Sequence, residues 1–252
     1  MSLGAYDFKD FYRRRRGRLI SRLLTGHIRA VLPSLMNKTL VGYGYAAPYI
    51  QKIYKDTDRA ICVNPSKFGG HHWPQGKPNA LCLSEGDALP LDTESVDCIL
   101  VVHGFEFADD PDAFLQECWR VLKGHGRLIL MVPNRTGLWA RYDGSPFGHG
   151  VPYTLRLLKT HLKKNLFVSE REERALFMPP FKSFLVLKTA YIFESFGRFF
   201  LSRLAGVHIL EASKQLYAGL PEGSREKNTQ RRYAVSNAAL SGNRTSIHEK
   251  TR

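Results

Sequence analysis

The sequence has few cysteines, and none of them forms a CxxC pair. This excludes the common zinc-binding and thiol-redox motifs. Three of Cys62, Cys82, Cys98 and Cys118 lie in apolar, strand-like stretches, where a thiol acts as a small hydrophobic side chain. We therefore interpret all four as core residues of a protein from a reducing, cytoplasmic compartment.

Long apolar runs are also missing. Arg22 interrupts the apolar stretch that begins at Leu19, and Lys188 and Glu194 interrupt the most apolar segment of the second half. Neither segment has the length of a signal peptide or a membrane span, so we expect a soluble protein. Metal-ligand spacing is absent as well, because His71 and His72 have no partners at suitable intervals; we expect no metal site.

Acidic residues are outnumbered, with 23 Asp and Glu against 37 Lys and Arg and a formal net charge of +14. Such an excess attracts phosphates and anionic lipid headgroups. Part of it forms an arginine tract made of Arg13, Arg14, Arg15, Arg16 and Arg18. Two interpretations of this tract remain open, a contact with nucleic acid and the solvated face of a helix.

The chain of 252 residues is long enough to bury a full core, and we expect one domain with appendages. Apolar residues at helical intervals predict an amphipathic helix over residues 6–32, within a basic N-terminal segment 1–33. Residues 34–220 form the expected domain. Residues 221–252 are polar and poor in large apolar groups, which predicts a disordered tail.

Within the domain, apolar strand-like segments alternate with helical ones. Strands are expected at residues 39–42, 60–63, 80–84, 96–102, 127–132, 167–177 and 207–216. Helices are expected after Pro48 and at residues 111–122, 153–162 and 184–204. Glycines after Pro133 indicate an insertion over about 134–165. The fold class is therefore α/β, a doubly wound, mostly parallel sheet with a helical and loop insertion after the fifth strand.

Two stretches carry recognisable motifs. Residues 40–46 read LVGYGYA, a glycine turn between a strand and a helix, where a backbone can approach a ligand closely. Residues 86–91 read GDALPL, residues 95–103 read SVDCILVVH, and residues 117–128 read ECWRVLKGHGRL. The run from 86 to 133 closely resembles the class I S-adenosylmethionine-dependent methyltransferases, specifically the type 11 methyltransferase domain of ubiquinone and menaquinone biosynthesis enzymes. Residues 39–66 resemble it loosely.

The resemblance implies a Rossmann-like fold with S-adenosyl-L-methionine as cofactor. It implies cofactor contacts for Gly42, Tyr43, Gly44, Asn64, Asp87, Ala88, Leu89, Val102 and His103. In the family, the acid corresponding to Asp87 accepts a hydrogen bond from the adenine amino group, and the amide corresponding to Ala88 reaches a ring nitrogen. Asn64 stands where the family usually has an acid that bridges the ribose hydroxyls.

Three positions depart from the family pattern. Leu40 replaces the acid that begins the first motif, Ala46 replaces its third glycine, and Asn64 replaces the ribose-binding acid. Together they allow weak cofactor binding, an altered binding mode, or a domain that no longer catalyses.

Candidate residues for chemistry lie after the fourth and fifth strands. His103 follows the fourth strand, and three roles stay open for it: taking a proton from the acceptor, lining the cofactor pocket, or making a structural hydrogen bond. Candidate acceptor contacts come from the fifth strand's end and the insertion: Asn134, Arg135, Tyr142, His149 and Tyr153.

We therefore expect an enzyme that transfers a methyl group to an unidentified small or lipid-like acceptor. Two alternatives stay open, a catalytically silent methyltransferase-like protein with a binding or regulatory role, and a nucleic-acid methyltransferase. The predicted helix 184–204 is rich in aromatic residues, namely Phe184, Tyr191, Phe196, Phe199 and Phe200. It suits core packing or a dimer contact, an apolar acceptor, or peripheral contact with a membrane.

Overall fold

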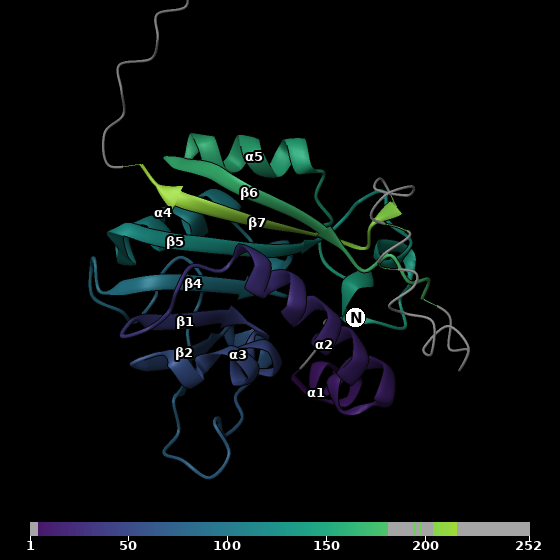
Figure 1. The fold of residues 1–252 in the computed structure, drawn as a ribbon, viewed down its shortest axis with the longest axis horizontal. Helices are drawn as coiled ribbons and strands as arrows, with labels where there is room; N and C mark the ends of the chain where they lie inside the picture. Colours follow the sequence, from purple (N-terminus) through teal and green to yellow (C-terminus); the bar gives the residue numbers. More distant parts are fainter. Residues whose placement is uncertain (1–4, 181–193, 195–196, 198–203, 216–252) are drawn as a thin grey trace, which may run out of the picture. The chain divides into compact units, whose positions relative to one another are not determined.

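The computed structural model describes residues 5–180, Glu194, Gly197 and 204–215. Its strands form one seven-stranded sheet in the order β3-β2-β1-β4-β5-β7-β6 (Figure 1). They are β1 (Thr39–Gly44), β2 (Arg59–Asn64), β3 (Leu81–Leu83), β4 (Val96–Val102), β5 (Leu122–Pro133), β6 (Phe167–Ala175) and β7 (Val207–Lys214). The first five strands pair in parallel, and β7 lies antiparallel between β5 and β6. The predicted α/β class with a mostly parallel sheet is confirmed.

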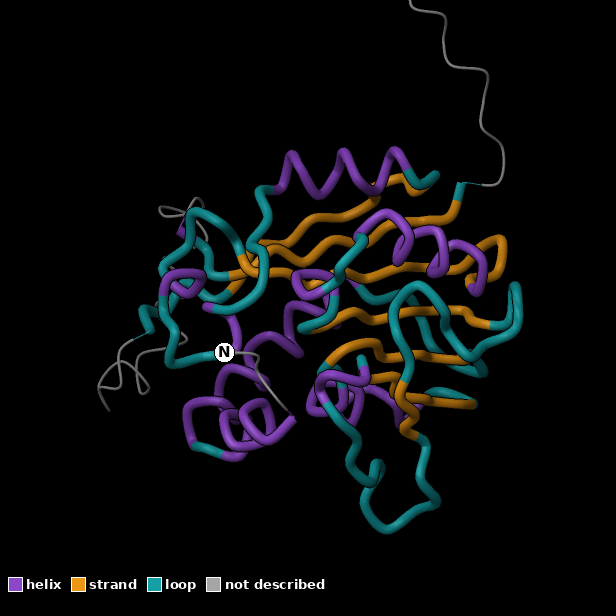
Figure 2. The backbone as a smooth tube through the Cα atoms, turned by 180° about the vertical axis from the view of Figure 1, so that it is seen from behind, coloured by secondary structure: helices purple, strands orange, loops and turns teal. Residues whose placement is uncertain are grey.

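Helices cover both faces of the sheet. The helices α1 (Ala5–Arg13), α2 (Arg15–Val31) and α3 (Ala47–Ile53) share one apolar cluster with alternate residues of the strands, including Leu40 and Leu100. The helices α4 (Pro111–Val121) and α5 (Leu155–Lys164) share a second cluster with the other residues, including Val41 and Ile99. Figure 1 shows α2 in front of the sheet, and Figure 2 shows α4 in front when the molecule is seen from behind.

The central strand β4 carries the clearest signal of the sheet in the sequence. All its residues are buried, as expected of a strand covered by helices on both faces. Its one charged residue, Asp97, accepts hydrogen bonds from the Thr39 amide at 3.0 Å and from Lys123 Nζ at 2.8 Å. Hydrogen bonding to Lys123 and Thr39 outweighs burial and lowers the pKa of Asp97, so the carboxylate ties β4 to the start of β1.

Most predicted elements stand within a few residues of their expected limits. The strand β5 starts at Leu122, directly after α4, rather than at residue 127, and its pairing with β4 shifts register between Val96 and Cys98. The predicted helix 184–204, with its aromatic surface, and the predicted tail 221–252 lie outside the described residues, apart from Glu194, Gly197 and Leu204.

The four cysteines are free thiols, with Cys62, Cys98 and Cys118 buried and Cys82 half-buried. Among the described residues, no group of histidine, cysteine, aspartate or glutamate side chains is arranged to hold a metal ion. In the same part of the chain, no helix has both the length and the apolar character needed to cross a membrane.

The single helix predicted over residues 6–32 is wrong, because the chain bends at Arg14 and forms two helices. Gly17 in α2 explains how closely the two helices pack. A Cβ atom at this position would lie 2.0 Å from the Phe11 carbonyl oxygen and 2.8 Å from Tyr12 Cα. The missing side chain of Gly17 therefore lets α2 pack directly against the backbone of α1.

We predict that Gly17→Ala destabilises the chain by about 1–3 kcal/mol, because the new methyl group overlaps the α1 backbone. Gly26→Ala on the same helix is the matched control. Its Cβ would meet nothing within 4 Å, so better helix propensity should stabilise the chain by about 0.5–1 kcal/mol. Urea unfolding and hydrogen exchange of the α1 amides measure both effects. Equal stabilisation by the two substitutions would contradict the close packing.

Candidate functional site

The carboxyl ends of β1, β2 and β4 meet at one edge of the sheet. Tyr43 pairs with Val63, and Gly44 pairs with Val102, so the residues that end or follow these strands are neighbours. Ligands of doubly wound sheets bind at this edge. The structure thus brings Gly44, Asn64, Val102 and His103 together, as the sequence predicts.

The two glycines of the first motif have different structural tasks. Gly44 has a φ of 79°, and a Cβ there would lie 2.3 Å from the Val102 carbonyl oxygen, so only glycine fits between β1 and β4. A Cβ at Gly42 would overlap the Ile50 side chain at 2.0 Å, which shows that α3 packs directly on the strand. Both glycines are therefore explained by close packing of the turn, of Gly42 against α3 and of Gly44 against β4.

Asn64 ends β2 with its side chain completely buried. Its Nδ2 donates a hydrogen bond to the Gly69 carbonyl oxygen at 3.1 Å, which fixes the amide group. Its Oδ1 is also buried and has no hydrogen-bond partner in the described part of the chain. Buried polar atoms are nearly always paired, so this oxygen is an acceptor prepared for a hydroxyl or amine donor.

Beside this edge lies a cavity of about 140 Å³. Its lining includes Tyr43, Gly86, Asp87, Asp110 and Phe114. Tyr43 packs against Phe114 with ring centres 4.7 Å apart, and a side chain at Gly86 would collide with both rings. The side chain of Asp87 is exposed, so its carboxylate can accept hydrogen bonds from a ligand in the cavity.

The two residues after Asp87 differ in what they can offer a ligand. The Ala88 amide makes only a long hydrogen bond of 3.4 Å to the Glu85 carbonyl oxygen. The Leu89 amide donates to Glu117 Oε1 at 3.0 Å, and the Leu89 carbonyl oxygen accepts from Arg120 Nη2 at 3.2 Å. The backbone of Leu89 therefore anchors the loop after β3 to α4. Contact of Leu89 with a cofactor stays a prediction.

His103 lies at the centre of a buried hydrogen-bond chain. Its Nδ1 lies 3.2 Å from Glu106 Oε1, and its Nε2 lies 2.7 Å from the Tyr12 hydroxyl, which in turn lies 2.8 Å from the Tyr49 hydroxyl. Because a carboxylate only accepts hydrogen bonds, we assign the imidazole proton to Nδ1, so that Nε2 accepts from Tyr12. Burial raises the pKa of Tyr12 well above its usual value and keeps that hydroxyl protonated.

The helix α1 covers this edge with aromatic side chains. The Phe8 ring is completely buried, with centre distances of 5.0 Å to Tyr45, 4.8 Å to Phe68 and 5.2 Å to His103. Tyr12 stacks on Tyr45 at 5.7 Å. Small-molecule sites usually measure about 300–1,000 Å³, more than the cavity of about 140 Å³ beside this edge, so we expect α1 to shift when a nucleoside-sized ligand binds here.

Two candidate acceptor residues hold the start of the insertion in place. Asn134 donates from Nδ2 to the Ala205 carbonyl oxygen at 2.7 Å, and its Oδ1 accepts from the Thr136 amide at 3.1 Å. Tyr153 is buried beside Asn134 in an isolated β-bridge and packs against Phe105 with ring centres 4.9 Å apart. Burial raises the pKa of Tyr153 to about 12. Direct contact of either side chain with an acceptor stays a prediction.

The other three candidates lie closer to solvent. Arg135 is exposed, and Tyr142 and His149 are half-buried. His149 lines a cavity of about 240 Å³ between α1 and residues 143–149, so part of the insertion does face the helix that covers His103. Contact with an acceptor stays a prediction for these residues too.

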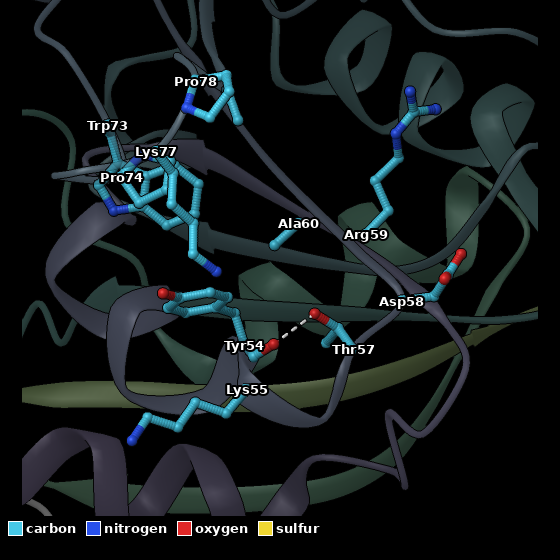
Figure 3. A pocket seen from close by; sticks show the side chains of 11 residues that line it. Tyr54, Lys55, Thr57, Asp58, Arg59, Ala60, Trp73, Pro74, Lys77 and Pro78 are labelled. Carbon is cyan, nitrogen blue, oxygen red and sulfur yellow. Dashed lines mark hydrogen bonds between the residues drawn. The ribbon is translucent and has the colours of Figure 1, made fainter.

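A larger cavity of about 870 Å³ lies elsewhere, at the amino end of β2 (Figure 3). Arg59 and Ala60 form the start of that strand, and Tyr54, Trp73 and Lys77 complete much of the wall. Lys77 Nζ lies 5.4 Å from the centre of the Tyr54 ring. This cavity is at the opposite end of the strand from Asn64, so it contributes nothing to the site at the carboxyl edge.

Sequence reasoning missed the side chains that surround His103. The spacing of Phe8 and Tyr12 indicates one helical face, but nothing local shows that this face covers the strand ends. Glu106 follows His103 by three residues. Its carboxylate reaches His103 because the backbone turns back after β4, and the sequence does not reveal that turn. His103 itself has a φ of 50°, a left-handed conformation that directs the following turn.

Comparison with known proteins agrees with this geometry. Residues 41–130 match the methyltransferase domain family. The malonyl-[acyl-carrier protein] O-methyltransferase of Methylococcus capsulatus is 27% identical over 166 residues, which cover 62% of this chain and 59% of the relative. The chain therefore spans less than two thirds of the length of this curated relative.

Solved methyltransferases share the fold. A putative methyltransferase of Haloferax volcanii, in complex with the Trm112 activator, has a TM-score of 0.58 and 15% identity over 84% of this chain and 96% of its own. The geranyl diphosphate C-methyltransferase of Streptomyces coelicolor, bound to Mg²⁺, geranyl diphosphate and S-adenosyl-L-homocysteine, has a TM-score of 0.53 and 13% identity over 76% and 79%. The chain therefore carries a methyltransferase domain over residues 41–130 and shares its fold with solved S-adenosylmethionine-dependent methyltransferases.

Proposed function

We propose that this chain binds S-adenosylmethionine at the carboxyl ends of β1, β2 and β4 and transfers its methyl group to a small or lipid-like acceptor. The observation that carries the proposal is the buried Oδ1 of Asn64, which has no hydrogen-bond partner among the described residues. It occupies the strand end at which the family holds the ribose. A hydroxyl donor from the cofactor would satisfy this oxygen, although more weakly than it would satisfy a charged carboxylate.

Other residues at the same edge fit the remaining parts of the cofactor. Asp87 presents an exposed carboxylate at the cavity of about 140 Å³, where it suits an adenine amino group. Gly44 keeps the turn after β1 free of side chains next to β4. When bound, the cofactor supplies a methyl group already activated on a sulfonium, so the chain has mainly to position the acceptor and remove a proton.

His103 is suited to remove that proton. Its Nε2 accepts a hydrogen bond from Tyr12 at 2.7 Å, and an acceptor hydroxyl would donate to the same nitrogen once Tyr12 moves. Glu106 at Nδ1 would stabilise the charged imidazole formed when the proton arrives. The shift of α1 that makes room for the cofactor would also release Nε2 from Tyr12.

The acceptor class is supported by the relatives. The curated relative is named for O-methylation of malonyl-[acyl-carrier protein], and one structural neighbour is named for methylation of geranyl diphosphate. Both acceptors combine an anionic group with an acyl or isoprenoid chain. For the present chain, an acidic acceptor of this kind is therefore the first to test.

A catalytically silent protein is the second candidate, and specific observations favour it. Phe8 and Tyr12 fill the edge where the cofactor would lie, and the fully buried Leu40 and Ala46 stand where the family has an acid and a glycine. In that case the aromatic packing is permanent, and a folded chain would not bind S-adenosylhomocysteine.

Asn64→Leu tests whether Oδ1 of Asn64 accepts a hydrogen bond from the cofactor. The substitution removes the acceptor oxygen while keeping a similar volume, so affinity for S-adenosylhomocysteine should fall about tenfold, the effect of one hydrogen bond of about 1.4 kcal/mol. Asn64→Asp restores the family's acid and should bind at least as tightly as the native chain. Calorimetric titration measures both, with circular dichroism as the control for folding. Native affinity in a folded Asn64→Leu chain would refute the assignment.

His103→Gln tests the proton acceptor. The rate of tritium transfer from methyl-labelled S-adenosylmethionine to acyl-thioester and lipid-like acceptors should fall about 10²–10⁴-fold, because a general base contributes that much. Affinity for S-adenosylhomocysteine should change less than the rate. An unchanged rate would leave His103 as a structural partner of Tyr12.

A further inference from the structure

Arg16 differs from the rest of the arginine tract. Arg13, Arg14, Arg15 and Arg18 are exposed, whereas Arg16 is half-buried. It lies in the first turn of α2, a turn that contains no acidic residue. The tract is therefore not one uniform basic face, and Arg16 has a separate role.

Aromatic rings hold the Arg16 side chain in place. Its Cζ lies 4.8 Å from the centre of the Tyr142 ring and 5.0 Å from that of Trp139. Its Nη1 donates to the Pro180 carbonyl oxygen at 3.2 Å and makes a marginal contact with the Tyr142 hydroxyl at 3.5 Å. Guanidinium groups stack well on aromatic faces, so the group has a fixed orientation.

The opposite edge of the guanidinium is unpaired among the residues that the structure describes. Nε and Nη2 are both buried, and neither makes a hydrogen bond in the described part of the chain. These two nitrogens carry parallel N–H bonds, the arrangement that matches the two oxygens of a carboxylate. Burying unpaired charged donors costs free energy, so an oxyanion that binds this edge would lower the desolvation cost of the guanidinium.

The unpaired edge belongs to a cluster that reaches the candidate site. Trp139, which supports Arg16, packs on Phe147 with ring centres 5.8 Å apart, and Phe147 packs on His103 at 4.7 Å. Both aromatic residues come from the insertion after β5, where the acceptor contacts are predicted. Thus a single ring, that of Phe147, separates the Trp139 support of Arg16 from the proposed proton acceptor.

We propose that Arg16 binds a carboxylate of the methyl acceptor through Nε and Nη2, with Trp139 and Tyr142 holding the guanidinium. The carboxylate assignment follows from the unpaired edge itself, whereas its placement on the methyl acceptor rests on the proposed function. The acceptor is thus an acid whose anionic group is held at the insertion while its reactive atom reaches His103.

Nuclear magnetic resonance of the arginine side chains tests the binding step without a known acceptor. The native chain, labelled with ¹⁵N at arginine, is titrated with sodium malonate at constant ionic strength, and sodium chloride serves as the blank. The Nε–H signal of Arg16 is assigned by its absence from Arg16→Lys. It should move and saturate with malonate, while the signal of the exposed Arg18, assigned with Arg18→Lys, should follow the blank.

A parallel titration with inorganic phosphate distinguishes the two sources of an oxyanion. Saturation by malonate at lower concentration than by phosphate supports the carboxylate assignment, and the reverse order overturns it. No saturable movement with either ion also overturns the proposal, since water would then satisfy the two donors. Calorimetry with S-adenosylhomocysteine on the same sample separates the claims, because lost cofactor binding contradicts the proposed function and leaves the Arg16 result standing.

Discussion

The packing of α1 on the carboxyl edge of the sheet is the constraint on which the rest of the site depends. A hydrogen bond from Tyr12 to His103 and the burial of Phe8 among Tyr45, Phe68 and His103 bring an N-terminal helix onto three strand ends. The Glu106 carboxylate, which lies against His103, is buried as well. In the proposed function, cofactor entry, proton removal and acceptor access would therefore all depend on the position of this one short helix.

The packing of α1 also relates to the residues by which the first motif departs from the family pattern. Leu40 and Ala46 are buried in the apolar cluster that also contains Phe8 and Tyr12. An acid at residue 40 would be costly in such surroundings unless it were paired. Leu40 and Ala46 thus belong to an aromatic and aliphatic interface on which α1 packs.

Much of the fold was predictable because its signals are local. The strand β4 is a continuous apolar run, and the phrases around Asp87 and Arg120 are specific to one family, so the sheet and its carboxyl edge followed from sequence. The positions of Asn64 and His103 at the strand ends followed from sequence for the same reason, since each stands at the end of a recognisable strand, whereas their roles stay predictions.

The rest depends on contacts between distant residues. Tyr12 and His103 are separated by 91 positions, and Arg16 and Tyr142 by 126. The bend at Arg14 is accompanied by the close approach of Gly17 to Phe11, a contact that helical periodicity does not predict. The insertion shows the same limit, because Asn134 and Tyr153 have residue types suited to binding but are engaged in holding the loop.

A crystal structure of the chain with S-adenosyl-L-homocysteine tests the central claim most directly. The account predicts the ribose against Asn64 Oδ1, the adenine beside Asp87, and α1 displaced so that Tyr12 no longer contacts His103. Well-ordered ligand at any other place, or crystals grown at saturating ligand in which α1 keeps its position and the strand ends stay covered, would contradict it.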